Sequence, residues 1–525
     1  MAVSRTRRVL RLGLVAALTA SALAGGVSTA SAAPVPFSSV VPAPASAVPA
    51  GGVTFTLGSG VAISADVAAI GDQLATTLRR STGYAIPVHT PPSGTDGVRL
   101  LLSGAPDSVG DQGYQLDVTA SGVVVRARQA AGLFAGVQTL LQLLPPAAQG
   151  TTVTAGPWVL AGGRITDQPR FGYRGAMLDV ARHFFTVAQV ERYVDQLARY
   201  KVNTLHLHLA DDQGWRIVIN GWERLATYGG STQVGGGPGG YYTQADYAAI
   251  VAYAQARYIT VVPEIDLPGH TNAALASYAE LNCDGKARPL YTGTDVGFSS
   301  LCTSKEITYT FLDAVLGQLA ALTPGQYLHI GGDEAQSTKP ADYKAFMNRV
   351  QQIATAHGKS ALVWHEVVNA TPAAGTVAQF WDTTTSNSAV AAAAKNGTKL
   401  VLSPANHAYL DMKYTSSSPI GQDWAGLVEV KKAYDWNPGA YLSGVAESAV
   451  NGVEAPLWTE TVTTSADIEY LAFPRLAAIA ELGWSPQSTH DWTAFSKRLA
   501  TQGPLWKLLG IKYYKSPQVT WPAGA

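Results

Sequence analysis

The chain has 525 residues, of which 47% are hydrophobic and only 14% are charged, and its 37 basic residues balance its 37 acidic ones. An average soluble protein carries roughly 25% charged residues, so this neutral and lightly charged chain argues against a polyanionic partner such as nucleic acid. The length allows two or three domains, and the hydrophobic content is enough to fill large cores.

The first 33 residues have the pattern of a secretory signal peptide. Four arginines between residues 5 and 11 precede an apolar segment at residues 12–24, and small residues ending in Ala32-Ala33 follow. The apolar segment is too short for a membrane span, and the small residues are typical of a cleavage site. We therefore expect a signal peptide at residues 1–33 and a secreted protein that does not associate with membranes.

Two further segments precede the main part of the chain. Residues 34–52 consist mainly of Pro, Ala, Ser and Val without a period, which predicts a flexible leader. Residues 53–166 mix helical and strand-like patterns, which predicts a small α+β domain. Its expected elements are helices over residues 66–81 and 132–144 and strands over residues 98–103 and 114–128. We assign this domain a structural role, with sugar binding as the alternative, because it lacks a cluster of acids or histidines.

From residue 167 to residue 525, short apolar strands alternate with longer helical segments. The candidate strands are residues 175–181, 204–210, 259–265, 327–331, 361–365, 377–380, 399–403 and 452–457. Eight such units predict a (β/α)₈ barrel, in which active residues gather at the C-terminal ends of the strands.

Cys283 and Cys302 are the only two cysteines. In an exported chain we expect a disulfide between them, which would close a loop of roughly 20 residues and contribute about 3 kcal/mol. The bond would hold the long segment at residues 267–301 as an active-site loop. We expect no metal at these cysteines, because no histidine cluster lies near them in the sequence.

The fourth strand ends in Gly331-Gly332-Asp333-Glu334. Neighbouring side chains on a strand point to opposite faces, so Asp333 and Glu334 reach one site only if the strand gives way, which two glycines permit. Crowding the two carboxylates would raise one pKa while the other group stays ionised, as an acid and a charge stabiliser require. The alternative is a loop in which Asp333 caps the following helix.

The other strand ends repeat the same theme of carboxylates and indoles. They carry Arg174 before the first strand and the segment 179–183 after it, then Asp211, Asp212, Glu264, Asp266, His270, Trp364, Glu366, Trp381, Tyr409, Asp411, Trp458 and Glu460. Indole faces stack on sugar C–H groups while carboxylates and arginines bind hydroxyls, so this composition indicates a carbohydrate pocket. We expect no nucleotide cofactor, because no phosphate-binding glycine loop is present.

The segment from His329 to Glu334 resembles the His-x-Gly-Gly-Asp-Glu signature of glycoside hydrolase family 20, the β-N-acetylhexosaminidases. The resemblance extends over the barrel and to the small domain before it. It implies an N-acetylated oligosaccharide substrate and a reaction without metal or cofactor; we also expect a monomer.

The resemblance also implies roles for single residues. Glu334 would be the general acid and then the base, while Asp333 and Tyr409 would hold the substrate's acetamide as it attacks the anomeric carbon. Asp211 and His270 resemble a relay that sets the protonation of Glu334. Two alternatives stay open: His270 stabilises its loop, or Asp212 takes the part of Asp211.

The remaining roles concern binding. Trp364, Trp381 and Trp458 resemble the walls of the sugar pocket, Arg174 and Glu460 resemble the clamps for sugar hydroxyls with Asp411 assisting, and Trp424 would stack on the leaving group; Glu264, Asp266 and Glu366 are lesser candidates. The sequence therefore predicts a secreted exo-β-N-acetylhexosaminidase with a retaining, substrate-assisted mechanism. The alternatives are a disaccharide-releasing enzyme of the lacto-N-biosidase type and a non-catalytic glycan binder, against which the presence of both Asp333 and Glu334 argues.

Overall fold

The computed structural model describes residues 33–92 and 97–525. All but the last residue of the predicted signal peptide therefore lies outside the described residues. Within these ranges no helix is long and apolar enough to cross a membrane.

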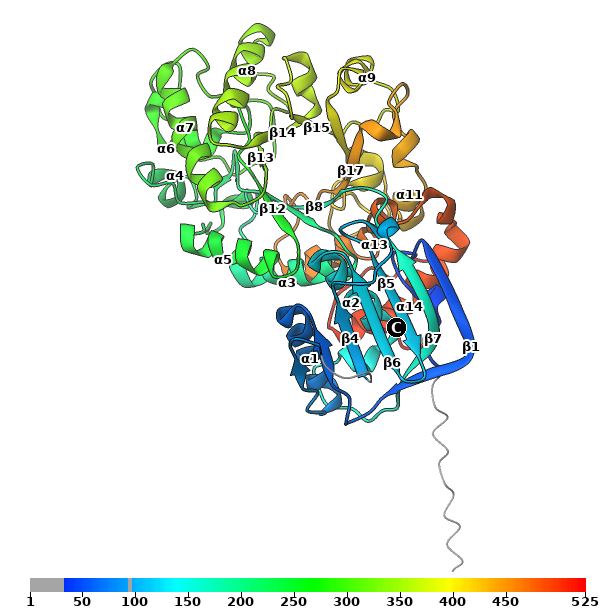
Figure 1. Ribbon diagram of the computed structural model, residues 1–525. Coiled ribbons are helices and arrows are strands. Elements are labelled where there is room, and N and C mark those ends of the chain that lie inside the picture. The colour runs from blue at the N-terminus through cyan, green and yellow to red at the C-terminus, as the bar shows by residue number, and fades with distance from the viewer. Residues whose placement is uncertain (1–32, 93–96) are drawn as a thin grey trace, which may run out of the picture. The chain divides into compact units, whose positions relative to one another are not determined.

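The N-terminal domain is built on a seven-stranded mixed sheet in the order β1-β7-β5-β6-β4-β2-β3. Its strands are β1 (Ser46–Leu57), β2 (Ile63–Ala65), β3 (Val88–His89), β4 (Gly97–Leu101), β5 (Tyr114–Thr119), β6 (Gly122–Ala127) and β7 (Trp158–Asp167). Helices α1 (Ala68–Thr82) and α2 (Ala130–Leu143) pack against this sheet (Figure 1). The predicted α+β class is confirmed.

The expectation of a flexible leader at residues 34–52 is wrong. Phe37 and Val41 are buried in the core, and Val41 exchanges two hydrogen bonds with the Gln142 amide, of 2.9 and 2.7 Å. Strand β1 begins at Ser46 and pairs antiparallel with β7. A few apolar anchors and backbone hydrogen bonds order the segment, and neither produces a period in the sequence.

The rest of the chain forms a closed barrel of eight parallel strands, in the order β12-β13-β14-β15-β16-β17-β8-β9. These are β8 (Tyr173–Asp179), β9 (Thr204–His208), β12 (Thr260–Glu264), β13 (Tyr327–His329), β14 (Ser360–Trp364), β15 (Val377–Phe380), β16 (Lys399–Leu402) and β17 (Val450–Ala455). Each overlaps one predicted strand, so the predicted barrel is confirmed.

Helices surround the strands, as α3, α5, α7 and α8 show in Figure 1. The helices are α3 (Val187–Arg199), α4 (Arg224–Thr227), α5 (Gln244–Gln255), α6 (Asn272–Ser277), α7 (Glu306–Leu322), α8 (Pro340–Ala356), α9 (Ser388–Lys395), α10 (Ala405–Ala408), α11 (Val430–Tyr434), α12 (Ser465–Ala472), α13 (Arg475–Trp484) and α14 (Trp492–Leu508). Helices α3 and α5 begin with capping boxes at Thr186 and Thr243, and α8 begins with a proline, where its missing N–H costs nothing.

The Asp167 carboxylate at the end of β7 ties the two domains together. It accepts hydrogen bonds from Tyr114 in the N-terminal sheet at 2.8 Å, and from Lys201 and Trp484 in the barrel domain at 3.2 and 3.0 Å. Asp167 and the Lys201 ammonium are both almost fully buried. Because a buried charge is costly unless it is paired, this carboxylate joins the two folding units energetically.

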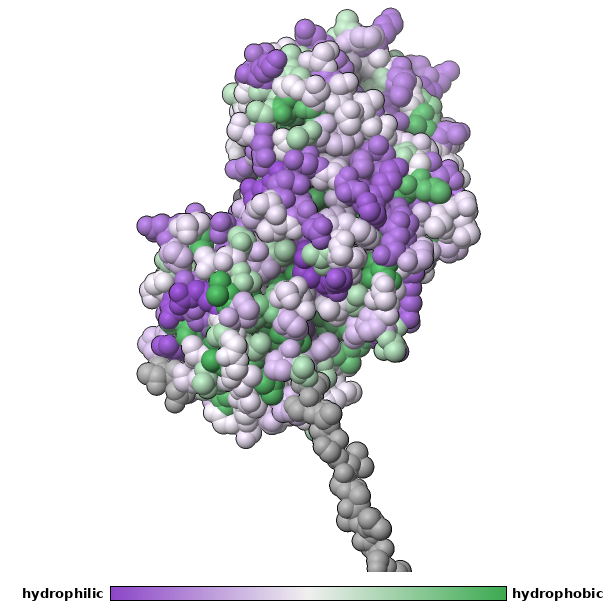
Figure 2. Space-filling model, turned by 90° about the vertical axis from the view of Figure 1, so that its right-hand side faces the viewer, coloured by the Kyte–Doolittle hydropathy of each residue, from purple (hydrophilic) through white to green (hydrophobic). Residues whose placement is uncertain are grey.

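The surface contains no broad continuous apolar area on the face drawn in Figure 2, where hydrophobic residues lie scattered among hydrophilic ones. The barrel interior, in contrast, contains several polar and charged side chains. Five polar side chains are fully buried there and contact one another across the barrel, namely His206, His208, Glu264, His329 and Glu454. Polar side chains therefore fill part of the space between the strands beneath their C-terminal ends.

Candidate active site

The backbone turns sharply where β13 ends, and this turn brings Asp333 and Glu334 to one cavity. Gly331 and Gly332 have φ values of 61° and 104°, in the left-handed region that favours glycine. A Cβ at Gly331 would lie 1.7 Å from the Asp266 Oδ1 atom, so the close approach of Asp266 requires a glycine. Glu334 itself has a φ of 44°, a strained value that is often found at functional sites.

A cavity of about 440 Å³ lies above these residues at the C-terminal ends of the strands. It is lined by Arg182, His270, Thr294, Val296, Asp333, Glu334, Trp381, Tyr409, Asp411, Gln422, Trp424, Trp458 and Glu460. Nine of the predicted site residues are in this lining. Arg182, Thr294, Val296 and Gln422 were missed.

The assignment of Arg174 to the pocket is wrong. Arg174 lies at the start of β8, away from the C-terminal strand ends, and its guanidinium donates to the Lys201 and Phe171 carbonyls at 2.9 and 2.8 Å. The pocket arginine is Arg182, which follows β8 and lies 2.8 Å from the Asp211 Oδ2 atom. The rule that barrel chemistry gathers at C-terminal strand ends could have selected Arg182, because the segment 179–183 follows the first strand.

His270 connects Glu334 to Asp211. The His270 Nε2 atom lies 3.3 Å from the Glu334 Oε2 atom, and its Nδ1 atom lies 3.2 Å from the Asp211 Oδ1 atom. Asp211 is positioned by a short hairpin of β10 (Ala210–Asp211) and β11 (Gly214–Trp215) that follows β9. Burial opposes a charge on His270, but Asp211 outweighs it and raises the pKa of His270 well above its usual value.

Asp212 has a different environment from Asp211. Its Oδ1 atom accepts hydrogen bonds from the Asn272 N–H at 2.9 Å and the Ser299 hydroxyl at 2.5 Å, and its Oδ2 atom is 4.0 Å from His270. The geometry therefore pairs Asp211 with His270, while Asp212 ties the loops that follow β9 and β12.

Burial controls the charge on Asp333. The residue is 8% exposed, and its burial raises the pKa of Asp333 to about 6, with the His270 cation opposing the shift and the Glu334 carboxylate adding to it. Asp266, which is also buried near Asp333, has a pKa raised well above its usual value. The expected crowding of carboxyl groups is present and involves Asp266 as well as the adjacent pair.

Aromatic rings form two sides of the cavity. The Trp381 and Trp424 rings lie 6.0 Å apart and nearly perpendicular, and the Trp381 indole donates to Glu366 at 3.1 Å. Trp424 is 55% exposed, so it forms the open edge. Trp364 is fully buried beneath Trp458, with ring centroids 6.0 Å apart. Trp364 therefore supports the wall without being part of the cavity lining.

Glu366 accepts the hydrogen bond from the Trp381 indole and so helps to orient that ring. Burial raises the pKa of Glu366 to about 8, with Asp333 adding to the shift and the Trp381 indole opposing it. The predicted lesser role for Glu366 is consistent with this position beside Trp381.

Three carboxyl groups in the cavity carry buried oxygens without a hydrogen-bond partner in the described part of the chain. These oxygens are Asp333 Oδ1, Asp411 Oδ2 and Glu460 Oε2. Burial raises the pKa of Asp411, and Glu460 adds to that shift. Buried polar groups are normally satisfied, so these oxygens are available to a ligand that carries hydroxyl or N–H donors.

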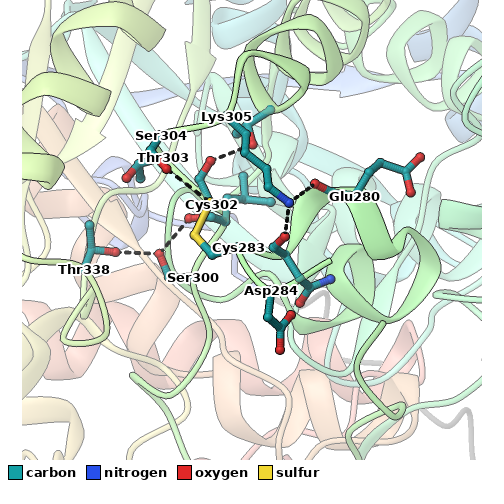
Figure 3. Close-up of a disulfide and its surroundings, with 12 residues drawn as sticks. Glu280, Cys283, Asp284, Ser300, Cys302, Thr303, Ser304, Lys305 and Thr338 are labelled. Atoms are coloured by element: carbon teal, nitrogen blue, oxygen red, sulfur yellow. Dashed lines mark hydrogen bonds between the residues drawn. A yellow bond between two sulfur atoms is a disulfide. The ribbon is translucent and has the colours of Figure 1, made fainter. Parts of the chain in front are cut away.

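A disulfide holds the loop that forms one edge of the cavity. Cys283 and Cys302 are bonded, as predicted (Figure 3). The Ser300 hydroxyl lies 2.6 Å from the Thr338 hydroxyl, and the Ser337 hydroxyl donates to the Gly297 carbonyl at 2.6 Å. The loop that contains Thr294 and Val296 is therefore attached to the segment that follows Glu334.

Among the residues that the structure describes, three groups of side chains are close enough to surround a cation. They are His206 with Glu264 and His329, Asp211 with Asp266 and His270, and His270 with Asp333 and Glu334. We assign no ion to them, because neighbouring protein groups account for their arrangement: His206 and His329 face Glu264 at 2.9 Å, and Arg182 and His270 face Asp211.

Known families match both parts of the chain. The model of the glycosyl hydrolase family 20 catalytic domain matches residues 171–487, and that of glycosyl hydrolase family 20 domain 2 matches residues 38–168. A β-N-acetylhexosaminidase of Cellulomonas fimi is 41% identical over 458 residues, which are 87% of this chain and 91% of that protein.

Solved structures resemble the whole described fold. The family 20 β-N-acetylhexosaminidase from Streptomyces coelicolor A3(2) is 57% identical with a TM-score of 0.91, over 94% of this chain and 100% of that one. A mutant Streptomyces plicatus β-hexosaminidase in complex with the product GlcNAc has the same identity and TM-score, over 94% of this chain and 99% of that one.

Proposed function

The chain belongs to glycosyl hydrolase family 20 and is a β-N-acetylhexosaminidase, and from that premise we propose that it releases single terminal GlcNAc or GalNAc residues from oligosaccharides such as chitin fragments. The proposal rests mainly on one observation: the turn at Gly331-Gly332 places Asp333 and Glu334 in the lining of the same cavity. An acid beside a second carboxylate fits a substrate whose own acetamide is the nucleophile.

In the proposed reaction, Glu334 donates a proton to the glycosidic oxygen as the bond to the anomeric carbon breaks. The acetamide carbonyl oxygen of the substrate attacks that carbon, and Asp333 accepts a hydrogen bond from the acetamide N–H. Tyr409, which lines the same cavity, donates to the carbonyl oxygen. Glu334 then takes a proton from water, which opens the oxazolinium intermediate and restores the original configuration.

The proposed exo action rests on the difference between the two sides of the cavity. Arg182 and Asp411 are 4% and 1% exposed, whereas Trp424 is 55% exposed. The unpaired oxygens of Asp411 and Glu460 would accept from hydroxyls of the terminal sugar, and the leaving group would extend past Trp424. A disaccharide-releasing enzyme would need further space beyond these clamps.

We also propose that the protein is secreted. The pattern of residues 1–33 supports export, and the disulfide supports an oxidising compartment.

A comparison of substrates tests the proposed function. The purified protein is assayed on aryl glycosides of β-GlcNAc, β-GalNAc, a β-linked disaccharide and β-glucose. We expect turnover of the N-acetyl monosaccharides and a rate on the β-glucoside at least about 10⁴-fold lower, because a lost hydrogen bond alone would cost only about 1–3 kcal/mol. Comparable rates on the β-glucoside would contradict substrate assistance, and release of a disaccharide would contradict the proposed release of single sugars. The absence of hydrolysis would favour the glycan binder.

A further inference from the structure

His208 lies directly beneath the active site and belongs to none of the roles described so far. It is fully buried in the barrel interior and does not line the cavity. Its Nε2 atom lies 2.8 Å from the Asp211 Oδ2 atom, and its Nδ1 atom forms a hydrogen bond with the Glu264 Oε2 atom. Both ring nitrogens face carboxyl oxygens, and only a ring that is protonated on both nitrogens, the cation, can donate to both carboxylates.

The charges around His208 support this state. Burial alone would lower the pKa of His208, but Glu264 and Asp211 outweigh it and raise it to about 9. Beyond those carboxylates lie the cations that also face them, Arg182 on Asp211 and His206 on Glu264. A neutral His208 would leave one carboxylate oxygen facing a bare ring nitrogen.

Glu264 fixes the lower side of His208. Its Oε2 atom also lies 2.9 Å from His206, and its Oε1 atom accepts a hydrogen bond from the Trp364 indole at 2.9 Å. Glu264 therefore fixes the orientation of the His208 ring. The other ring nitrogen contacts Asp211, and Asp211 in turn contacts His270, whose Nε2 atom faces Glu334.

We propose that His208 is a positioning residue for the acid–base step, which orients Asp211 from beneath and thereby holds His270 against Glu334. The proposal rests on the proposed role of Glu334 as the acid. His208 touches neither the substrate nor the reacting atoms. The His208 ring also contacts the Trp458 ring edge-on, with the ring centroids 4.9 Å apart. Because Trp458 lines the cavity, the test must separate an effect on the acid–base step from an effect on sugar binding.

Two substitutions separate the two sides of the ring. The amide nitrogen of His208→Asn falls near the position of Nδ1, which keeps a donor to Glu264 and loses the one to Asp211. The amide nitrogen of His208→Gln falls near Nε2, which keeps the donor to Asp211. His206→Gln is the matched control, because His206 is on the same face of the same strand and lies between Glu264 and Glu454 at 2.9 Å without touching Asp211.

The readout is the ratio of kcat/KM on a dinitrophenyl β-N-acetylglucosaminide to kcat/KM on the phenyl glycoside, which needs more help from an acid. Glu334→Gln is the reference and should raise this ratio by roughly 10²-fold or more. We expect His208→Asn to raise this ratio at least about tenfold and His208→Gln to raise it by less than about threefold. His206→Gln should lower the melting temperature and leave the ratio within about twofold of the wild-type value.

Several results would overturn the proposal. If His208→Asn lowers kcat/KM equally on both substrates, His208 only supports the fold or Trp458. If His206→Gln raises the ratio of kcat/KM values as much as His208→Asn does, the effect is a general disturbance of the barrel interior. If Glu334→Gln itself leaves the ratio unchanged, the proposed role of Glu334 fails instead. Should His208→Asn not fold, histidine-selective ¹⁵N NMR of the wild-type protein decides: both ring nitrogens of His208 should be protonated from pH 5 to 8, and a neutral ring contradicts the proposal.

Discussion

At the level of single residues, the Asp333 carboxyl is useful for chemistry and costly for the fold. Its pKa is raised to about 6, above the value near 4 of an exposed aspartate, because burial disfavours the ionised form. The folded protein therefore binds this proton more tightly than the unfolded chain does. Stability is lost as the pH rises from about 4 to about 6, and the full cost is present above pH 6.

Replacing Asp333 with Asn should remove that cost. We expect Asp333→Asn to be more stable than the wild type by on the order of 2 kcal/mol above pH 6 and by close to zero below pH 4. Denaturant unfolding at pH 4 and pH 7.5 measures the difference, and Asp72→Asn, an exposed carboxyl on α1, is the control. A difference between variant and wild type that does not change with pH would contradict this assignment.

Arg182 and Arg174 provide a second test at this scale, because both are buried arginines near β8. Arg182→Gln removes from the cavity wall the guanidinium that pairs with Asp211 at 2.8 Å, so we expect kcat/KM to fall by about 10²–10³-fold. Arg174→Gln removes hydrogen bonds to backbone carbonyls, so it should lower the melting temperature and leave KM within about twofold. The opposite pattern would restore the original assignment of Arg174.

At the scale of elements, the disulfide loop links stability to substrate length. Its cysteines are 19 residues apart, so breaking the bond should cost about 3 kcal/mol. Because the loop contributes Thr294 and Val296 to the cavity edge, we expect reduction to raise KM for oligosaccharides more than for a small aryl glycoside. Melting temperature and KM are measured with and without reductant. The double variant Cys283→Ser/Cys302→Ser should not respond to reductant, and two reactive thiols in the untreated protein would refute the bond.

The elements also show what the sequence predicts well. The barrel strands are short apolar runs between helical segments, so their existence and order could be predicted. Strand β1 could not, because Ser46–Leu57 is rich in small residues and most of its side chains are exposed. The buried histidines were overlooked although His206 and His208 are two residues apart and so share one face of β9.

The candidate site divides in the same way. Residues a few positions beyond a strand end, such as Asp333 after β13 and Glu460 after β17, could be predicted from the barrel rule. Thr294, Val296 and Gln422 lie in irregular loops without a period, and only the folded chain brings them to the cavity. The side chains that face Asp211 are Arg182, His208 and His270, from three places in the chain, and only the family resemblance paired one of them, His270, with Asp211.

At the scale of the whole molecule, Asp167 makes the two domains depend on each other. Asp167→Asn keeps the shape of the side chain but leaves the buried Lys201 ammonium without its counterion, which should cost about 3–5 kcal/mol. Calorimetry should show one transition at a lower temperature, because the carboxylate contacts both domains. Asp117→Asn, which breaks partly exposed ion pairs within the N-terminal sheet, is the control and should cost less than about 1 kcal/mol. Two separate transitions in the wild-type protein would contradict the coupling.

The exposure of Trp424 has an optical consequence. The chain has twelve tryptophans, all in the described ranges, and Trp424 alone among them is exposed. The Trp424 indole is in contact with solvent at the edge of the cavity, so its fluorescence lies at the long-wavelength side of the emission band, whereas the other indoles are shielded from solvent to differing degrees. Acrylamide should therefore quench the red side of the emission band first. A saccharide that covers Trp424 should shift the band to the blue and protect it from the quencher, so that occupancy of the leaving-group side can be followed by fluorescence without any bond being cleaved.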